Sequence, residues 1–236
     1  MVIGGLQKLT LQDYPDRIAA IIFTFGCNFR CHFCYNPQLV VPDRDGAVLK
    51  GHSTLNENGL FGFLRSRRGK LEAVVISGGE PTIHPDLPEF IGRIKELGYL
   101  VKLDTNGTNP EMLSRLLGGQ LLDYIAMDLK APLAKYQSVV GVKLALNKIK
   151  KSIKIIITSG IGYEFRTTLL PQLHSRADIV KMGELIKGAE KWYLQKFRSN
   201  VDLVDNEFKN KSAYPDREME KLRQLATSYV KFCGVR

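Results

Sequence analysis

Six short apolar runs, each followed by a stretch with helical periodicity, constrain the fold of this chain more than any other feature. The runs lie at 18–25, 73–77, 100–105, 124–128, 163–169 and 192–197. Strand-like runs that alternate with helices predict parallel βα units with right-handed crossovers. Six such units predict an α/β fold whose sheet curls toward an incomplete barrel.

The helical stretches carry local start and stop signals. The residues Thr54–Glu57 have the pattern of a capping box, which predicts a helix start there. One later helix has an apolar face at helical spacing, formed by Leu146, Ile149, Ile153 and Ile156. We expect the last helix to run from Asp216 to about Phe232.

Three of the four cysteines fall within eight residues, directly after the first apolar run. Cys27, Cys31 and Cys34 have the spacing CxxxCxxC, which brings three thiolates within reach of one metal centre. A closed zinc or iron–sulfur site normally has four protein ligands, so one coordination position stays open. Cys233 could complete a zinc site, but we expect it to be a half-buried residue at the end of the last helix. Disulfides fit poorly with an odd local triplet.

The cysteine triplet, with the aromatic Phe33 directly before its last member, resembles the signature of the radical S-adenosylmethionine superfamily. The resemblance implies a partial TIM barrel of the (β/α)6 type. It also implies a 4Fe-4S cluster held by Cys27, Cys31 and Cys34, whose open iron chelates the amino and carboxylate groups of S-adenosylmethionine. Phe33 is then expected beside the cofactors.

A Gly-Gly-Glu-Pro segment follows the second run. In folds of this kind the active site lies at the C-terminal edge of the parallel strands, which is where this segment is expected. Two glycines let a ligand approach the backbone, and a carboxylate with exposed carbonyls suits an ammonium group. The segment resembles the GGEP motif of the superfamily. The resemblance implies that the methionine amino group of S-adenosylmethionine is held by Gly78, Gly79, Glu80 and Pro81.

Polar residues also follow the third and fourth runs. Asp104 and Asn106 come after the third, and Asp128 and Lys130 after the fourth. These residues resemble those of activases of glycyl-radical enzymes. The resemblance implies that Asp104, Asp128 and Lys130 help hold the cofactor's carboxylate, with Asn106 beside them. In some relatives the two aspartates also bind a monovalent cation.

Two residues on later runs complete the candidate cofactor site. On the fifth run, Glu164, Arg166 and Thr168 share one side by period-two alternation. Arg166 in a barrel mouth needs an anionic partner, and the cofactor's carboxylate is the natural candidate. Gln195, late on the sixth run, could reach the ribose or adenine. No side chain stands out as an acid or base.

Three longer segments narrow the resemblance to the short activating proteins of anaerobic ribonucleoside-triphosphate reductase. They are 5–15, 34–40 and 165–171. The resemblance implies hydrogen abstraction from a glycine of a partner glycyl-radical enzyme, with a reduced flavodoxin or ferredoxin as electron donor. One departure is Tyr35, where many relatives have histidine. Two other hypotheses are a radical enzyme acting on a small molecule or RNA, such as a deazapurine synthase or tRNA modifier, and a non-catalytic metal-binding protein.

Length and composition indicate the number of domains, the cellular location and the kind of partner. The chain has 236 residues and is expected to be one domain, 1–236, with a core at about 17–200, a short N-terminal segment and a C-terminal helix. It shows no membrane-length apolar segment and no export signal, which favours the reducing cytoplasm. The net charge is +10, but the basic residues are scattered. Solvated helix faces are therefore favoured over a nucleic-acid surface.

Overall fold

The structure, a computed structural model, describes residues 1–40 and 56–236. They form two compact units by their internal packing. Unit 1 comprises Met1–Asn28, Gln38–Thr105 and Glu111–Ile125, and unit 2 comprises Phe29–Pro37, Asn106–Pro110 and Ala126–Arg236. In each unit the strands follow one another in chain order.

Unit 1 contains the first strands. They are β1 (Ile3–Thr10), β2 (Ala19–Thr24), β3 (Ala73–Gly78), β4 (Leu100–Thr105) and the start of β5 (Tyr124–Asp128), which crosses into unit 2. β1 pairs antiparallel with β2, whereas β2 pairs parallel with β3, and β3 with β4. The helices lying mostly or wholly in this unit are α1 (Pro37–Val40), α2 (Glu57–Ser66), α3 (Leu87–Glu96) and α4 (Pro110–Gly118), with a 3-10 turn at Pro81–Ile83.

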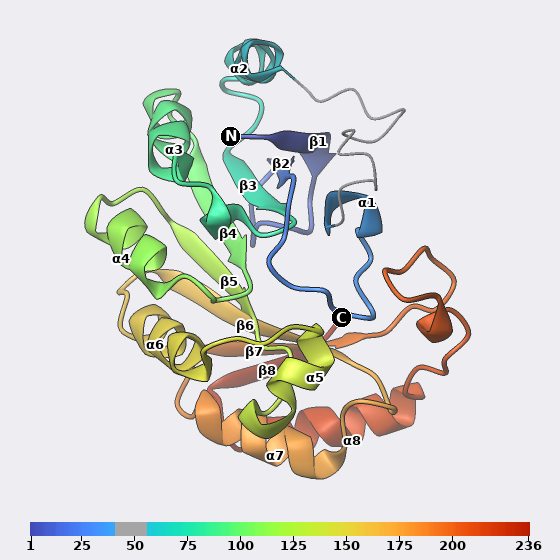
Figure 1. The fold of residues 1–236 in the computed structure, drawn as a ribbon. Coiled ribbons are helices and arrows are strands. Elements are labelled where there is room, and N and C mark those ends of the chain that lie inside the picture. The colour runs from blue at the N-terminus through green and yellow to red at the C-terminus, as the bar shows by residue number, and fades with distance from the viewer. Residues whose placement is uncertain (41–55) are drawn as a thin grey trace. The chain divides into compact units, whose positions relative to one another are not determined.

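Unit 2 contains the later strands, β6 (Gly162–Leu169), β7 (Lys191–Lys196) and β8 (Phe232–Val235), with β6 parallel to β7 and β7 parallel to β8. Figure 1 shows α6, α7 and α8 along one face of these strands. The helices are α5 (Tyr136–Val140), α6 (Leu146–Ile157), α7 (Arg176–Leu185) and α8 (Asp216–Thr227), with 3-10 turns at Leu133–Lys135 and Asn206–Phe208.

Strand β3 shows why the apolar runs are continuous rather than alternating. All four residues from Ala73 to Ile76 are fully buried, so both faces of the strand are covered. Parallel strands that are covered on both faces have continuous apolar sequences for this reason. On one face, Ala73 and Val75 pack in a cluster that includes Tyr14 and Tyr124, whose ring centroids are 6.0 Å apart.

The predicted elements are present. All six apolar runs are strands, β2 to β7. The apolar face predicted for α6 is confirmed at Ile149, Ile153 and Ile156, which are buried. Helix α2 begins at Glu57 with Asn56 as its N-cap, whose side chain accepts a bond from the Asn58 amide at 2.9 Å. The first half of the predicted capping box, Thr54 and Leu55, lies outside the described residues.

The C-terminal prediction is wrong in one respect. Helix α8 ends at Thr227, and Phe232–Val235 forms strand β8. The Phe232 amide donates to the Glu190 carbonyl and the Arg236 amide to the Leu194 carbonyl, so pairing with β7 stabilises the strand. Cys233 is therefore a buried strand residue opposite Trp192 and not a helix residue. The expected N-terminal segment is likewise an edge strand, β1.

None of the helices in the described part of the chain has the length and apolar character of a membrane span.

Candidate active site

The cysteine loop follows β2. Cys27 is a half-buried residue of unit 1, and Cys31 and Cys34 belong to unit 2. Within unit 2, the Cys34 amide donates to the Cys31 carbonyl at 3.1 Å, which makes a tight turn between the two thiols. The Val204 amide donates to the Cys34 carbonyl at 3.3 Å and the Asp205 amide to the His32 carbonyl at 3.1 Å. Backbone bonds to the segment after β7 thus hold the loop.

Burial favours the protonated form of Cys31 and Cys34. Burial raises the pKa of Cys31 to about 11 and also raises the pKa of Cys34, while the nearby Lys130 ammonium lowers both. A bound metal displaces such protons, because its charge compensates the thiolates. Three thiols are the number that a 4Fe-4S cluster with one open iron requires. Among the described residues, no three His, Cys, Asp or Glu side chains are arranged around a single metal ion. The fit therefore rests on the number and chemistry of the donors.

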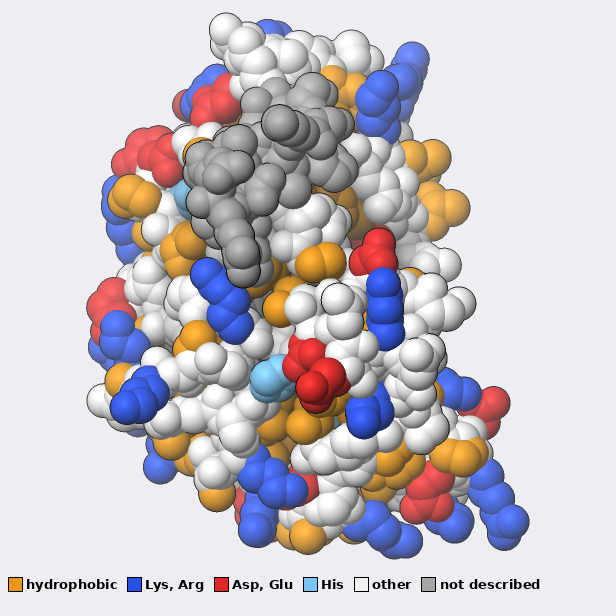
Figure 2. Space-filling model, turned by 45° about the vertical axis from the view of Figure 1, so that its right-hand side comes forward, with side chains coloured by type: hydrophobic (Ala, Val, Ile, Leu, Met, Phe, Trp, Pro, Cys, Tyr) orange, Lys and Arg blue, Asp and Glu red, His pale blue; other side chains and the backbone are white. Residues whose placement is uncertain are grey.

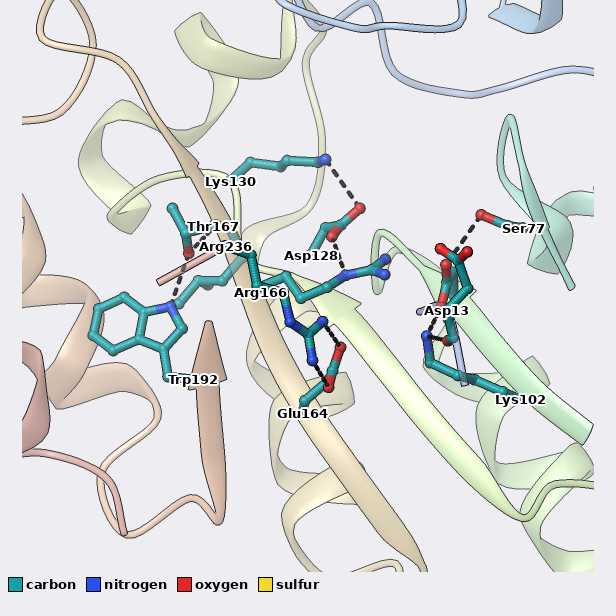
Figure 3. Close-up of polar contacts among 12 residues, drawn as sticks. Asp13, Ser77, Lys102, Asp128, Lys130, Glu164, Arg166, Thr167, Trp192 and Arg236 are labelled. Atoms are coloured by element: carbon teal, nitrogen blue, oxygen red, sulfur yellow. Dashed lines mark hydrogen bonds and ion pairs between the residues drawn. The ribbon is translucent and has the colours of Figure 1, made fainter. Parts of the chain in front are cut away.

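A carboxylate between two cations lies in the same unit. Asp128 ends β5, and its Oδ1 accepts from Arg166 Nε of β6 at 3.0 Å, while its Oδ2 accepts from Lys130 Nζ at 3.1 Å (Figure 3). Burial opposes the charge on Asp128, but Arg166 and Lys130 outweigh it and lower its pKa to about 2. Burial likewise opposes the charge on Lys130, and Asp128 outweighs it, so its pKa is raised. The three groups carry one net positive charge, which suits a ligand carboxylate.

The side of β6 that carries Arg166 is not uniform in its contacts. Glu164, two residues earlier, is 1% exposed and accepts two bonds from the guanidinium group of Arg236, at 3.0 and 3.2 Å (Figure 3). Of the two charged residues predicted on one side of the strand, Arg166 contacts Asp128 and Glu164 contacts Arg236.

The Gly-Gly-Glu-Pro segment forms a tight turn at the end of β3. Gly78 has a φ of +114°, and a Cβ there would lie 2.3 Å from the Thr24 amide nitrogen. A Cβ on Gly79 would lie 1.9 Å from the Gly26 carbonyl oxygen. Both glycines are thus required by the close approach of the backbone after β2. Contact of their carbonyls with a ligand amino group stays a prediction.

Glu80 is held inside unit 1. It is 1% exposed, and its Oε1 accepts bonds from the Thr82 amide at 3.1 Å, from the Thr82 hydroxyl, and from Thr105 Oγ1 at 2.7 Å. The carboxylate therefore caps the 3-10 turn at Pro81 and ties β3 to β4. Any ligand contact of this oxygen would share it with three existing donors.

Asp104, at the end of β4, has an internal cationic partner that the sequence analysis missed. Its Oδ1 lies 3.0 Å from Lys102 Nζ, and its Oδ2 accepts from Ser77 Oγ at 3.1 Å. Lys102 is 1% exposed. The signal was present, because residues two apart on a strand share a face, and an isolated lysine in an apolar strand needs a buried partner.

The remaining predicted residues lie in separate places. Asn106 is buried, and its Oδ1 accepts from the Thr108 amide at 3.0 Å, an Asx turn that continues the chain out of β4. Gln195 is half-buried on β7, in register with Thr168. Phe33 is buried in unit 2, edge-on to His174 with ring centroids 6.4 Å apart.

His174 is a second residue that the sequence analysis missed. Its Nδ1 accepts from the Leu170 amide at 3.2 Å, so its Nε2 carries the proton and donates to the Lys130 carbonyl at 2.8 Å. Burial lowers its pKa, which keeps the ring neutral. His174 thereby fixes the backbone at Lys130, and no local pattern in the sequence indicates this role.

Residues 21–185 match the family model of the Radical SAM superfamily. The chain belongs to this superfamily. It is therefore an enzyme of the radical S-adenosylmethionine type, and membership implies a 4Fe-4S cluster and S-adenosylmethionine as cofactors. The recognition made from the cysteine motif is confirmed.

A protein of Methanocaldococcus jannaschii, provisionally named a glycyl-radical enzyme activating enzyme, is 33% identical over 235 residues, covering 97% of this chain and 93% of the relative. The structure of Streptococcus suis SuiB bound to its precursor peptide SuiA is similar with a TM-score of 0.66 and 15% identity, covering 92% of this chain and 48% of SuiB. A domain of a pyruvate-formate lyase-activating enzyme from Bacteroides vulgatus has a TM-score of 0.56 and 18% identity, covering 70% of this chain and 99% of the domain. These likenesses confirm the α/β radical SAM fold.

Proposed function

We propose that this protein cleaves S-adenosylmethionine reductively and activates a glycyl-radical enzyme with the radical that results. The observation that carries the proposal is the similarity, along almost the whole chain, to a relative that is named as such an activating enzyme. The proposal takes residues 1–236 as one functional domain. The fold alone would leave the substrate open, because one fold hosts many reactions.

Cys27, Cys31 and Cys34 are proposed to hold the 4Fe-4S cluster. When bound and reduced, the cluster supplies the electron that breaks the bond between the sulfonium and ribose C5′ of S-adenosylmethionine. Lys130 and Arg166, which both contact Asp128, are proposed to bind the methionyl carboxylate. Planar, charge-assisted contacts of this kind also fix the orientation of a carboxylate.

The other predicted residues orient the rest of S-adenosylmethionine. The turn formed by Gly78, Gly79, Glu80 and Pro81 offers backbone oxygens to the amino group. Asp104, at the end of β4, and Asn106, two residues later, are assigned to the methionine part of S-adenosylmethionine. Phe33 and Gln195 are assigned to the adenosine moiety, one from the cysteine loop and one from β7.

Cleavage of the bond between the sulfonium and ribose C5′ would leave a 5′-deoxyadenosyl radical. This radical would take a hydrogen atom from the α-carbon of a glycine in the partner, which would yield 5′-deoxyadenosine and a glycyl radical. Such a transfer demands near contact between the two carbons. A reduced flavodoxin or ferredoxin is the proposed electron donor. The proposed setting is the cytoplasm, where reducing conditions preserve the cluster.

The test mixes the anaerobically reconstituted and reduced enzyme with S-adenosylmethionine and a glycyl-radical reductase from the same genome. We expect an organic radical signal in electron paramagnetic resonance, with a doublet that collapses when the partner contains deuterated glycine. A partner with alanine in place of the radical glycine is the matched control and should give no signal.

The opposite outcome would favour the enzyme acting on a small molecule or RNA. In that case no protein radical forms, and 5′-deoxyadenosine appears only when RNA or a purine precursor is added. Figure 2 shows basic side chains interspersed with acidic and uncharged ones on the face it displays. On that face, the described side chains form no single basic patch of the kind that binds nucleic acid.

A further inference from the structure

Two buried polar side chains, Thr167 of β6 and Trp192 of β7, form a short chain of hydrogen bonds behind the Asp128 cluster. The indole Nε1 of Trp192 donates to Thr167 Oγ1 at 3.0 Å (Figure 3). The Thr167 hydroxyl in turn donates to the Leu129 carbonyl at 2.8 Å. Thr167 is 1% exposed, and Trp192 and Leu129 are fully buried. All of these residues belong to unit 2.

The chemistry of the three groups fixes the direction of this chain. An indole N–H donates and cannot accept, so the Thr167 oxygen accepts from Trp192 and its own proton goes to the Leu129 carbonyl. The side chain of a β-branched residue also has few rotamers, which leaves the hydroxyl little freedom to turn away. Removing the hydroxyl would take a partner from a buried donor and from a buried acceptor at once.

Leu129 lies between Asp128 and Lys130 in the chain, and both of its backbone polar groups are bonded to β6. Its amide donates to the Arg166 carbonyl at 2.8 Å, and its carbonyl accepts from Thr167. The backbone that carries Asp128 and Lys130 is therefore held against the backbone that carries Arg166. Because side chains alternate along a strand, Thr167 and Arg166 point to opposite sides of β6.

We propose that Thr167 and Trp192 are positioning residues for the methionyl carboxylate of S-adenosylmethionine. The inference rests on the proposed assignment of Lys130 and Arg166 to that carboxylate. Two cations bind one carboxylate best when their spacing is set before the ligand arrives. The hydrogen-bond chain sets this spacing from within the protein core, where water does not compete for the same groups.

The test compares S-adenosylmethionine with decarboxylated S-adenosylmethionine, which lacks the group in question. Thr167→Val keeps the shape of the side chain and removes the hydroxyl. We expect the dissociation constant for S-adenosylmethionine to rise roughly threefold to tenfold, the scale of one lost hydrogen bond. The value for the decarboxylated ligand should stay as in the wild type. Thr167→Ser restores the hydroxyl and should restore the wild-type affinity, in anaerobic titrations of reconstituted enzyme with matched iron content.

A second measurement reports on the hydrogen-bond chain without any ligand. The protein has one tryptophan, so ¹⁵N-labelled reconstituted enzyme gives one indole N–H resonance. A buried, hydrogen-bonded N–H exchanges slowly with solvent, and we expect this of the wild-type indole. Thr167→Val should move the resonance upfield and speed the exchange, and Thr167→Ser should reverse both changes.

Tyr99→Phe is the matched control, because it removes another buried bond from a hydroxyl to a backbone carbonyl. Tyr99 is 3% exposed, and its hydroxyl donates to the Leu64 carbonyl at 2.7 Å in unit 1. We expect this variant to have a lower thermal unfolding midpoint. Both dissociation constants and the indole resonance should keep their wild-type values.

A merely structural role would weaken the binding of both ligands by the same factor, and this result in Thr167→Val would overturn the proposal. Wild-type binding of both ligands would also overturn it. If Thr167→Val does not fold, Trp192→Phe decides, since it removes only the indole donor: a selective loss of affinity for S-adenosylmethionine supports the proposal, and an unchanged ratio of the two affinities overturns it. The titrations do not use the glycyl-radical assay. A protein that activates no partner can still meet these expectations, whereas activation without the selective effect of Thr167→Val rejects this inference alone.

Discussion

Replacing Arg166 with alanine tests the assignment of the Asp128 cluster to the cofactor's carboxylate. Arg166 donates from Nε to Asp128 at 3.0 Å, and its side chain is 13% exposed. Without it, the cluster has one cation and one anion and no net positive charge. The cluster would then attract a ligand carboxylate much less strongly.

The magnitude follows from the loss of one charge-assisted contact, which typically costs ~1.5–3 kcal/mol. This corresponds to a dissociation constant for S-adenosylmethionine that is larger by roughly tenfold to a hundredfold. The assay is an anaerobic titration of the reconstituted enzyme, with iron content measured on the same samples. Iron content should be unchanged, because Arg166 is not a cluster ligand.

Arg236→Ala is the matched control, because it removes a two-bond contact to Glu164 on the same strand, β6. We expect this variant to lose stability and to keep the wild-type affinity. Decarboxylated S-adenosylmethionine gives a second check, since wild type and Arg166→Ala should bind it equally. The reasoning is refuted if Arg166→Ala binds S-adenosylmethionine as tightly as Arg236→Ala does.

Three other predictions concern the cluster, acid stability and the partner. Cys31→Ala should abolish the intact cluster and all cleavage of S-adenosylmethionine, whereas Cys233→Ala, which alters a buried strand residue, should keep both. Absorption spectra and iron counts measure the cluster in each variant. The reverse pattern would contradict a cluster held by Cys27, Cys31 and Cys34 with one open iron. The folded-state pKa of Asp128 is lowered to about 2 from an ordinary value of 3.8, so its contribution of roughly 2 kcal/mol is fully present above pH 4 and is lost as the pH falls toward 2. The stability difference between wild type and Asp128→Asn in urea unfolding should therefore narrow below pH 4, and a constant difference would count against the ionised cluster. We expect the net charge of +10 to speed the encounter with the partner. Activation should therefore slow as salt rises past about 0.15 M, where charges more than ~8 Å apart are screened, and a rate independent of salt would contradict electrostatic capture.

The sequence by itself determined the elements whose signals are local. The six parallel strands were readable because strands buried on both faces are continuous apolar runs. The spacing of Cys27, Cys31 and Cys34 also predicts a three-thiol ligand set. These features depend on residues that are neighbours along the chain.

The tertiary structure decided which charged groups meet. The sequence placed Arg166 and Glu164 on one side of a strand, but the structure gives them different partners, Asp128 and Arg236. Strand β8 was missed for a similar reason, since four residues form a strand here only through hydrogen bonds to β7. For Lys102 the sequence offered Asp104 as a partner two residues away, but the contact of its ammonium group with the Asp13 carbonyl depends on how the chain packs. Strand register and packing decide which residues far apart along the chain come into contact. Both are properties of the folded chain and not of any local segment.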